Sequence, residues 1–309
     1  MGQLAFVFPG QGAQVLGMGK DLSENFASSK GIFDAATAAL GYDMAALCNE
    51  QGELLNQTEY TQPAILTASI AALQPVLEAG IKADYVAGLS LGEYSALVAA
   101  GVLDFSEAVK TVRQRGKWMQ EAVPAGVGGM TAVLGAERSL VEATVASVEG
   151  ICEVANYNCP GQIVIAGELE ALARGEEALK AAGVRKMMRL NVSGPFHTSM
   201  LKPASDQLGG LLQTITVNSP TIPYVTNVTG QLASTEPNDI RELLTKQVMQ
   251  SVRWEDSIVT LLEAGVDTFV EIGPGKVLSG FIKKINKEVK VYNIEDTATL
   301  KAFVEAMQG

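Results

Sequence analysis

Short apolar runs alternate with amphipathic segments along this chain, and many of the runs end at a glycine or a proline. Apolar runs rich in β-branched and aromatic residues predict buried strands, whereas apolar positions at helical spacing predict helices. We expect strands at 4–8, 85–87, 224–227 and 268–272, and helices at 24–40, 63–79, 93–100, 108–122, 202–212, 240–248 and 256–264. Pro63 is expected in the first turn of its helix, where a missing N–H is tolerated. This alternation predicts an α/β fold with a parallel sheet.

The pattern changes at a glycine-rich hinge around 124–129. Beyond the hinge, the predicted order is strand, helix, strand, strand, helix, strand, which is that of a ferredoxin-like βαββαβ unit. These elements are expected at 130–134, 139–148, 152–156, 162–167, 169–182 and 186–192. We therefore predict a large subdomain at 1–126 and 197–309, with a small ferredoxin-like subdomain inserted at 127–196.

The composition indicates a compact globular protein. Of the 309 residues, 47% are apolar and 18% are charged, which is too apolar for a disordered chain. No apolar run reaches the roughly 18 residues that a membrane span needs, and we expect no signal peptide. An odd set of cysteines (Cys48, Cys152, Cys159) and a single histidine argue against a disulfide framework or a zinc site, and favour the reducing cytoplasm. The net charge of −11 argues against nucleic-acid binding, but it allows an acidic partner at a local basic patch.

The segment Gly88-Leu89-Ser90-Leu91-Gly92 joins the predicted strand at 85–87 to the predicted helix at 93–100. Its two glycines permit a sharp turn and close packing, so that Ser90 would lie at the tip of a nucleophile elbow. The positive end of the following helix would favour negative charge there. The large subdomain is therefore predicted to be α/β-hydrolase-like. The alternative is an ordinary strand-to-helix turn, because a chain with 31 glycines meets this pattern by chance.

A serine nucleophile needs a base within hydrogen-bond reach, and His197 is the only imidazole in the chain. It follows Gly194-Pro195-Phe196 beside the predicted subdomain boundary, where clefts tend to form. No aspartate partner is evident, and a long segment follows His197, unlike in ordinary α/β-hydrolases. The protein is therefore not expected to be a standard esterase.

Two glycine loops lack the features of nucleotide-binding motifs. Pro9–Gln14 has Val15 where a dinucleotide fingerprint needs its third glycine, and 273–276 lacks the spacing of a phosphate-binding loop. The first loop is expected to turn its backbone N–H groups and glutamines toward the carboxyl end of the sheet.

Seven motifs in order carry a family resemblance over essentially the whole chain. They are FVFPGQGAQ (6–14), YTQPAILTAS (60–69), GLSLGEYSALVAAG (88–101), RGKWMQEA (115–122), NYNCPGQIVIAG (156–167), GPFHTSMLKPA (194–204) and EIGPGKVLSGF (271–281). With these motifs the chain resembles the bacterial malonyl-CoA:acyl carrier protein transacylases of type II fatty acid synthesis. One departure is Leu89, where the family often has histidine. That histidine is not the family's base, so we interpret Leu89 as a packing difference.

The resemblance implies a ping-pong transfer through a malonyl-serine. Ser90 would attack the thioester of malonyl-CoA while His197 takes its proton, and the acyl group would pass to the phosphopantetheine thiol of acyl carrier protein. The backbone N–H groups of Gln11 and Leu91 would hold the oxyanion. The main-chain carbonyl of Gln247 would orient His197 in place of a carboxylate.

The resemblance also implies that Arg115 binds the malonyl carboxylate, because a guanidinium can hold a carboxylate with two parallel hydrogen bonds. The alternative is a solvated helix face, which we favour for Arg113 and Lys110. Gln62, Met119 and Asn158 match pocket-lining positions. Phe196 matches the bulky residue that related acyltransferases carry when they choose malonyl over branched extenders.

The implied partners are malonyl-CoA and an acidic carrier protein, and the family implies a monomer without metal or bound cofactor. A basic docking surface is expected among Arg185, Lys186, Arg189, Lys202, Lys276, Lys283, Lys284 and Lys287. Two other functions stay open at this point. One is a serine hydrolase that releases malonate to water, and the other is a non-catalytic subunit that only binds carrier protein.

Overall fold

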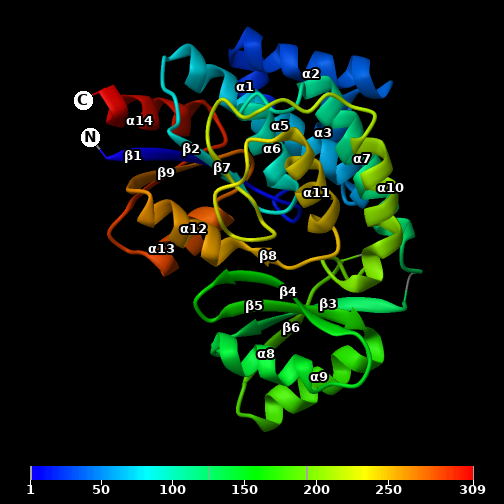
Figure 1. Cartoon of the computed structure of the whole chain (residues 1–309). Helices are drawn as coiled ribbons and strands as arrows, with labels where there is room; N and C mark the ends of the chain where they lie inside the picture. The colour runs from blue at the N-terminus through cyan, green and yellow to red at the C-terminus, as the bar shows by residue number, and fades with distance from the viewer. Residues whose placement is uncertain (1, 125, 193, 309) are drawn as a thin grey trace.

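The computed structural model describes residues 2–124, 126–192 and 194–308, which form a large and a small lobe, each with its own five-stranded sheet (Figure 1). In the large lobe the strand order is β10-β9-β1-β2-β7, and every neighbouring pair is parallel. The strands are β1 (Gln3–Phe8), β2 (Tyr85–Gly88), β7 (Tyr224–Val225), β9 (Val266–Ile272) and β10 (Lys290–Ile294). The parallel α/β sheet predicted from the sequence is confirmed.

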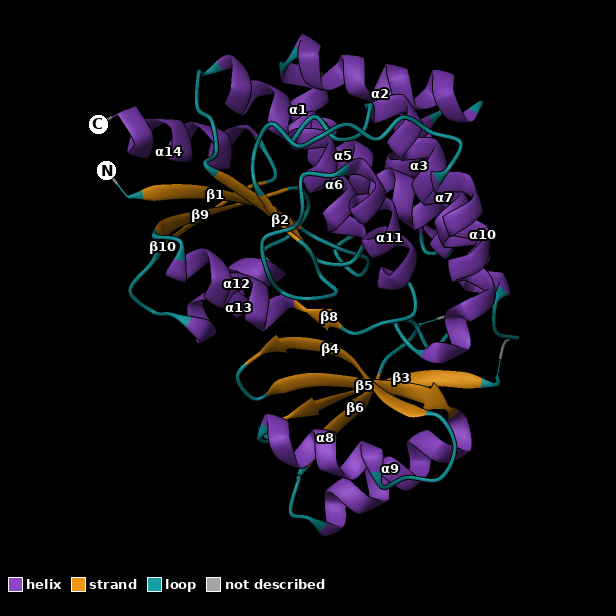
Figure 2. Ribbon diagram, in the orientation of Figure 1, coloured by secondary structure: helices purple, strands orange, loops and turns teal. Residues whose placement is uncertain are grey.

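Helices cover both faces of this sheet, with α12 and α13 on one side and α5 and α6 on the other (Figure 2). The large lobe contains α1 (Lys20–Asn25), α2 (Ala27–Leu40), α3 (Met44–Glu50), α4 (Gly52–Leu55), α5 (Thr58–Glu78), α6 (Leu91–Ala99), α7 (Phe105–Glu121), η1 (Ser199–Leu201), α10 (Lys202–Leu212), α11 (Pro237–Gln247), α12 (Trp254–Glu263), α13 (Val277–Ile285) and α14 (Thr297–Gln308). None of the helices in the described ranges is both long and apolar enough to cross a membrane.

Two helix predictions were wrong in detail. The helix expected at 24–40 is two helices, because Phe26 between them is extended (φ −129°, ψ 120°). Helix α5 begins at Thr58, so Pro63 lies inside the helix rather than in its first turn. An interior proline costs about 3 kcal/mol, but each fully buried Leu or Ile contributes about 1.5–3 kcal/mol. Because most of α5 is buried, packing outweighs the missing backbone hydrogen bond.

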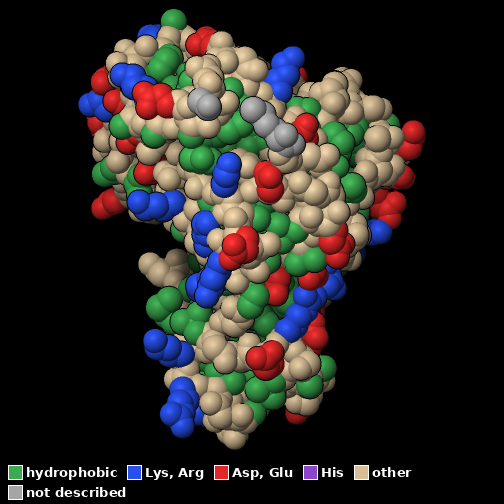
Figure 3. All heavy atoms as spheres, turned by 90° about the vertical axis from the view of Figure 1, so that its left-hand side faces the viewer, with side chains coloured by type: hydrophobic (Ala, Val, Ile, Leu, Met, Phe, Trp, Pro, Cys, Tyr) green, Lys and Arg blue, Asp and Glu red, His purple; other side chains and the backbone are tan. Residues whose placement is uncertain are grey.

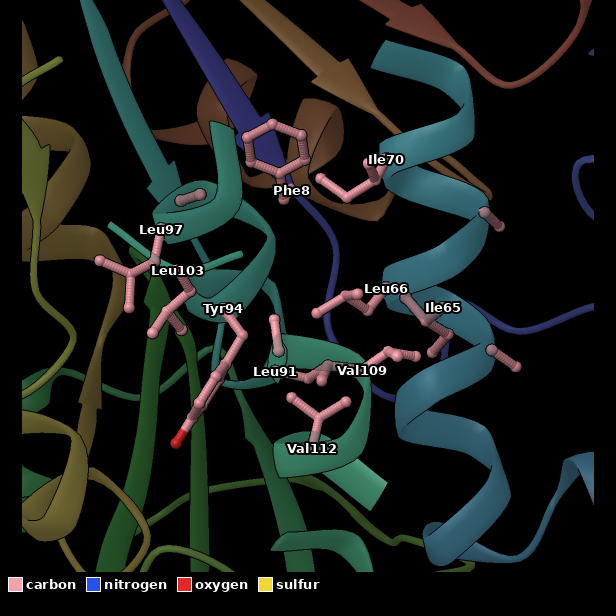
Figure 4. Close-up of a cluster of buried hydrophobic side chains, with 14 of the residues drawn as sticks. Phe8, Ile65, Leu66, Ile70, Leu91, Tyr94, Leu97, Leu103, Val109 and Val112 are labelled. Carbon is pink, nitrogen blue, oxygen red and sulfur yellow. The ribbon is translucent and has the colours of Figure 1, made fainter. Parts of the chain in front are cut away.

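The elbow helix α6 lies in the centre of the largest hydrophobic cluster (Figure 4). Its side chains meet the end of β1 and the facing sides of α5 and α7. The contacting residues include Phe8, Ile65, Leu66, Ile70, Leu91, Tyr94, Leu97, Val109 and Val112, all of which are buried. The turn that carries Ser90 is thus fixed by packing on three sides.

The small lobe has the predicted βαββαβ order. Its elements are β3 (Gly128–Leu134), α8 (Arg138–Ala146), β4 (Cys152–Cys159), β5 (Gln162–Glu168), α9 (Leu169–Ala181) and β6 (Lys186–Arg189). These strands lie in the order β6-β3-β5-β4 with antiparallel neighbours, and α8 and α9 cover one face (Figure 1). This is the ferredoxin-like arrangement expected from the sequence.

The large lobe also contributes to the small sheet. Strand β8 (Val252–Arg253), which the sequence did not predict, pairs parallel with β4 through Asn156 and Tyr157. Near this pairing, Arg138 of α8 donates two hydrogen bonds to Asp256 of α12 at 2.6 and 3.1 Å. The small sheet therefore extends beyond the proposed insertion, whose boundaries at 126/127 and 196/197 stay a prediction.

The backbone around the elbow is packed too closely for any side chain at its two glycines. A Cβ at Gly92 would lie 2.1 Å from the carbonyl oxygen of Phe8, and one at Gly88 would lie 1.9 Å from the backbone of Gly92. Because both contacts are with backbone, they cannot be relieved by a rotamer change. Glycine is therefore required here by space.

We predict that Gly92→Ala lowers the free energy of unfolding by about 2–4 kcal/mol, because the added methyl group forces β1 and α6 apart. Gly210→Ala is the matched control, since Gly210 is exposed in α10 and a Cβ there would meet nothing within 4 Å. That variant should be more stable by about 0.5–1 kcal/mol. Urea denaturation measures both, and equal stability of the two variants would contradict the packing argument.

Candidate active site

Ser90 lies between the end of β2 and the start of α6, with backbone angles (φ 54°, ψ −105°) that side-chain-bearing residues rarely adopt. The fully buried Asn227 holds this turn from both sides. Its Oδ1 accepts a hydrogen bond from the Ser90 N–H at 2.6 Å, and its Nδ2 donates to the Gly88 carbonyl at 2.7 Å. These bonds fix the serine on the tip of the elbow.

His197 meets the serine from the chain that leaves the small lobe. Its Nε2 lies 2.8 Å from Ser90 Oγ, and its Nδ1 lies 2.8 Å from the main-chain carbonyl oxygen of Gln247. A carbonyl oxygen can only accept, so Nδ1 carries the proton and Nε2 is left as the acceptor for the hydroxyl. The imidazole thus has the tautomer that a general base for Ser90 needs.

The His197 backbone is also strained, with φ at 61°, and side chains on both flanks hold it. The Thr198 hydroxyl donates to the carbonyl of Pro195 at 2.7 Å. The Glu153 carboxylate, on β4 of the small lobe, accepts from the backbone N–H of Ser199 at 2.8 Å and from its hydroxyl at 2.6 Å. The position of the imidazole therefore depends on both lobes.

Burial and, to a smaller extent, the nearby positive charge of Arg115 together lower the pKa of His197 to about 4, against the hydrogen bonds to the backbone of Gln247 and Gln250. Only 4% of the residue is exposed. The imidazole is consequently neutral at pH 7 and ready to accept a proton.

Arg115 extends from α7 to the same point. Its two terminal nitrogens donate to Gln62 Oε1 at 2.8 Å, to Gln247 Oε1 at 3.0 Å and to Ser90 Oγ at 3.2 Å. The side chain is 1% exposed, yet no carboxylate of the described residues forms an ion pair with it. A buried cation of this kind is unfavourable until an anion reaches it.

Lys110 and Arg113, two other cations on α7, are placed differently from Arg115. Lys110 is exposed and pairs with Glu107. Arg113, which we expected on a solvated face, is half-buried instead, because it pairs with Glu59 at 3.0 Å and lies over the ring of Tyr42. Of these three cations, Arg115 alone reaches the serine.

A cavity of about 250 Å³ lies between the lobes, with Ser90 and His197 in its wall. Five of the residues predicted from the sequence also line it: Gln11, Gln62, Met119, Asn158 and Phe196. The remaining wall residues are mostly apolar and come from both lobes and from α13. Arg115 lies behind this wall, and Gln62, which also contacts Met119 Sδ at 3.5 Å, connects it to the cavity.

The predicted oxyanion donors lie on either side of the serine. Gln11 belongs to the loop after β1, which packs on the elbow so closely that a Cβ at Gly10 would lie 2.4 Å from the Leu89 carbonyl oxygen. Leu91 opens α6, so its N–H has no intrahelical acceptor. Leu89 itself lines the cavity, so it shapes the binding space as well as the packing.

Sequence reasoning missed two residues that hold this site, Asn227 and Glu93. Asn227 lies two residues after the end of β7, at the carboxyl end of the strand next to β2, where polar residues of a parallel sheet often serve function. Glu93 is the one charged residue of α6, and it is completely buried. An acid within an otherwise apolar helix was the available signal.

Comparisons with known proteins agree with this geometry. Residues 5–302 match the acyl transferase domain family. The malonyl CoA-acyl carrier protein transacylases of Bacillus subtilis and Escherichia coli are each 44% identical to the chain, covering 100% and 99% of it and 98% and 100% of their own lengths.

Solved structures match equally well. The malonyl CoA-acyl carrier protein transacylase of Clostridium perfringens superimposes with a TM-score of 0.96 at 48% identity, over 99% of this chain and 97% of its own. A malonyl-transacylase in complex with its type II PKS acyl-carrier protein has a TM-score of 0.95 at 42% identity, over 98% and 99% of the two chains. The chain therefore belongs to the acyl transferase domain family and, within it, to the malonyl CoA-acyl carrier protein transacylases.

Proposed function

We propose that this protein transfers the malonyl group of malonyl-CoA to the phosphopantetheine thiol of an acyl carrier protein, and so supplies malonyl-acyl carrier protein for fatty acid elongation. The observation that carries the proposal is the position of Ser90 Oγ, which lies 2.8 Å from a neutral imidazole and 3.2 Å from an unpaired buried guanidinium. The first group activates a nucleophile, and the second selects an acyl group with a free carboxylate.

In the first half-reaction, Ser90 Oγ attacks the thioester carbonyl while its proton moves to His197 Nε2. The Gln247 carbonyl stabilises the imidazolium through the bond from Nδ1. The N–H groups of Gln11 and Leu91 would stabilise the oxyanion. When the tetrahedral intermediate collapses, the C–S bond breaks and the CoA sulfur leaves with the proton from His197, so that malonyl-serine remains.

The second half-reaction reverses these steps with a different thiol. His197 takes the proton of the phosphopantetheine thiol, the sulfur attacks the serine ester, and Ser90 Oγ leaves with the proton from Nε2. The largely apolar cavity wall favours a thiol on a long flexible arm over water. This supports acyl transfer over the hydrolysis that the elbow alone would allow.

Arg115 gives the site its substrate preference in this proposal. The malonyl carboxylate would replace Gln62 and Gln247 as acceptors for the guanidinium, and would give this buried charge the ion pair that no described residue provides. Met119, Asn158 and Phe196 would shape the space around the short acyl group.

The carrier protein would dock beside α13. Lys276, Lys283, Lys284 and Lys287 are exposed there, and Lys284 Nζ reaches Gln162 of the small lobe at 3.3 Å. The same helix lines the cavity through Val277 and Leu278. Figure 3 looks onto this side of the molecule, where Lys and Arg side chains continue down the face into the small lobe.

Of the other candidates for the docking surface, Arg185 and Lys186 are also exposed, whereas two form ion pairs. Lys202 pairs with Asp206, and Arg189 pairs with Glu176. We retain the cytoplasm as the proposed location, which is consistent with three buried free thiols, and a monomer as the proposed assembly.

Acylation of Ser90 is the direct test of this function. Mixed with malonyl-CoA alone, the wild-type protein should gain the mass of one malonyl group in a stoichiometric burst, and Ser90→Ala should gain none. Intact-protein mass spectrometry with malonate quantification follows both products. Continuous malonate release would indicate a hydrolase, and an unlabelled wild-type protein would refute the proposal, including its catalytic step.

Arg115→Ala should reduce kcat/KM for acylation by malonyl-CoA about 30-fold or more, because roughly 2–5 kcal/mol of charge-assisted contact is lost. Acylation by acetyl-CoA, which has no carboxylate, should change much less. Arg113→Ala on the same helix is the control and should keep the wild-type preference. An equal loss of kcat/KM for malonyl-CoA and acetyl-CoA in Arg115→Ala would mean that the guanidinium does not bind the malonyl carboxylate.

Charge reversal on α13 should weaken carrier-protein docking. In Lys283→Glu combined with Lys284→Glu, transfer from preformed malonyl-enzyme to carrier protein should need several-fold more carrier protein, and added salt should shrink the difference. Transfer to free pantetheine, which makes no protein contacts, should be unchanged. Lys30→Glu on α2 is the matched surface control. Unchanged half-saturation for carrier protein in the double variant would exclude this surface.

A further inference from the structure

Glu93 is a buried carboxylate three residues after the nucleophile, and the mechanism above does not use it. It is fully buried in the first turn of α6. Its Oε2 accepts from Gln247 Nε2 at 2.7 Å and from the Asn227 N–H at 3.2 Å. Its Oε1 makes no hydrogen bond within the described part of the chain. The carboxylate is therefore only half satisfied by its surroundings.

The Gln247 amide joins this carboxylate to Arg115. Its Nε2 donates to Glu93 and, at 2.9 Å, to the Ser90 carbonyl, while its Oε1 accepts from Arg115 at 3.0 Å. The amide orientation follows from these partners, because the Ser90 carbonyl can only accept and the guanidinium can only donate. A negative and a positive buried group thus face each other across one amide.

We propose that Glu93 is the internal counter-charge of Arg115, positioned through the Gln247 amide, and that it competes with the substrate carboxylate for that guanidinium. The inference rests on the proposed function, since it assumes that Arg115 receives the malonyl carboxylate. Glu93 is a positioning and specificity-determining residue, because it reaches the reacting atoms only through Gln247. Its charge sets how strongly the empty site attracts an acyl group that carries a carboxylate.

The surroundings of Glu93 favour a change in the charge of its carboxyl group near neutral pH. Arg115 of α7 is the nearby cation, and the hydroxyl-bearing rings of Tyr94 on α6 and Tyr224 on β7 are its other titratable neighbours. Burial raises the pKa of Glu93 to about 7, against the hydrogen bonds from Gln247 and Asn227 and the charge of Arg115. Burial raises the pKa of both tyrosines as well, so they remain neutral.

A pH dependence of malonyl binding follows, and its sign is fixed. Below pH 7 Glu93 is protonated, and the charge of Arg115 is free for the substrate. Above pH 7 the ionised carboxylate partly neutralises Arg115, so that malonyl-CoA binds more weakly. By linkage, a malonyl carboxylate on Arg115 raises the affinity of Glu93 for a proton, and binding takes up protons from solvent.

The test compares Glu93→Gln with Glu93→Ala in acylation by malonyl-CoA between pH 6 and 8.5. For the wild type we expect KM to rise about 3- to 10-fold over this range, as judged from a charge interaction in a partly polar interior. Glu93→Gln keeps an acceptor for Gln247 and Asn227 but has no charge, so its KM should stay at the low value throughout. Glu93→Ala should in addition lower kcat about tenfold, because Gln247 and Asn227 both lose an acceptor.

Three controls separate charge from structural damage. The KM for acetyl-CoA should not rise with pH in any variant, since acetyl-CoA has no carboxylate that could compete with Glu93 for Arg115. Glu271 is another buried carboxylate whose pKa is raised, but it accepts hydrogen bonds from Leu278 and Ser279 and not from Arg115. In Glu271→Gln the KM for malonyl-CoA should therefore rise with pH as in the wild type. Recovery of kcat in Glu93→Gln relative to Glu93→Ala shows that the hydrogen bonds, and not the charge, position Gln247.

The outcomes are distinct from those of the proposed function. A malonyl adduct on wild-type Ser90 upholds the transfer mechanism whatever Glu93 does. The inference on Glu93 is overturned if the KM of wild-type protein is independent of pH, if Glu93→Gln shows the wild-type rise, or if acetyl-CoA shows the same rise as malonyl-CoA.

Discussion

The constraint on which this site depends is the buried positive charge of Arg115, which forms no ion pair with any residue that the structure describes. Arg115 is almost fully enclosed, and its terminal nitrogens are satisfied by two glutamine side chains and by the nucleophile itself. Neutral acceptors hold a guanidinium in place without neutralising it. In the proposed function, a carboxylate that binds Arg115 offsets the cost of burying this charge, and this difference favours a malonyl group over an acyl group without a carboxylate.

Gln247 connects Arg115 with the other groups of the site. Its carbonyl fixes the tautomer of His197, its side-chain oxygen holds Arg115, and its side-chain nitrogen bonds the elbow carbonyl and Glu93. One residue at the end of α11 thus couples the base, the clamp and the nucleophile. Because Gln247 is buried, a small displacement of this residue would disturb all three groups.

Ser90 and His197 both have strained backbones, and both are held by groups distant in the sequence. Asn227 follows β7 and secures the elbow, while Glu153 of the small lobe secures the turn after His197. Strain of this kind persists only where the surroundings over-determine the conformation. The small lobe consequently does more than cover a cavity, since part of the geometry of His197 comes from it.

The sequence alone predicted β1, β2, β7 and β9 of the large sheet and the βαββαβ order of the small lobe. It also pointed to the elbow at Ser90, the one imidazole at His197 and the distinctive cation at Arg115, because these features depend on local periodicity and on the chemistry of neighbouring residues. The sequence misplaced the start of α5 around Pro63, because the burial of this helix outweighs the local preference of proline against a helix interior. It missed β8, because a strand of two residues is too short to show an alternation of polar and apolar positions. The counter-charge role proposed for Glu93, the bonds of Asn227 and the half-buried state of Arg113 were decided only by tertiary structure. Each depends on which distant acceptor, donor or ring the fold brings within a few ångströms, and no local pattern specifies that.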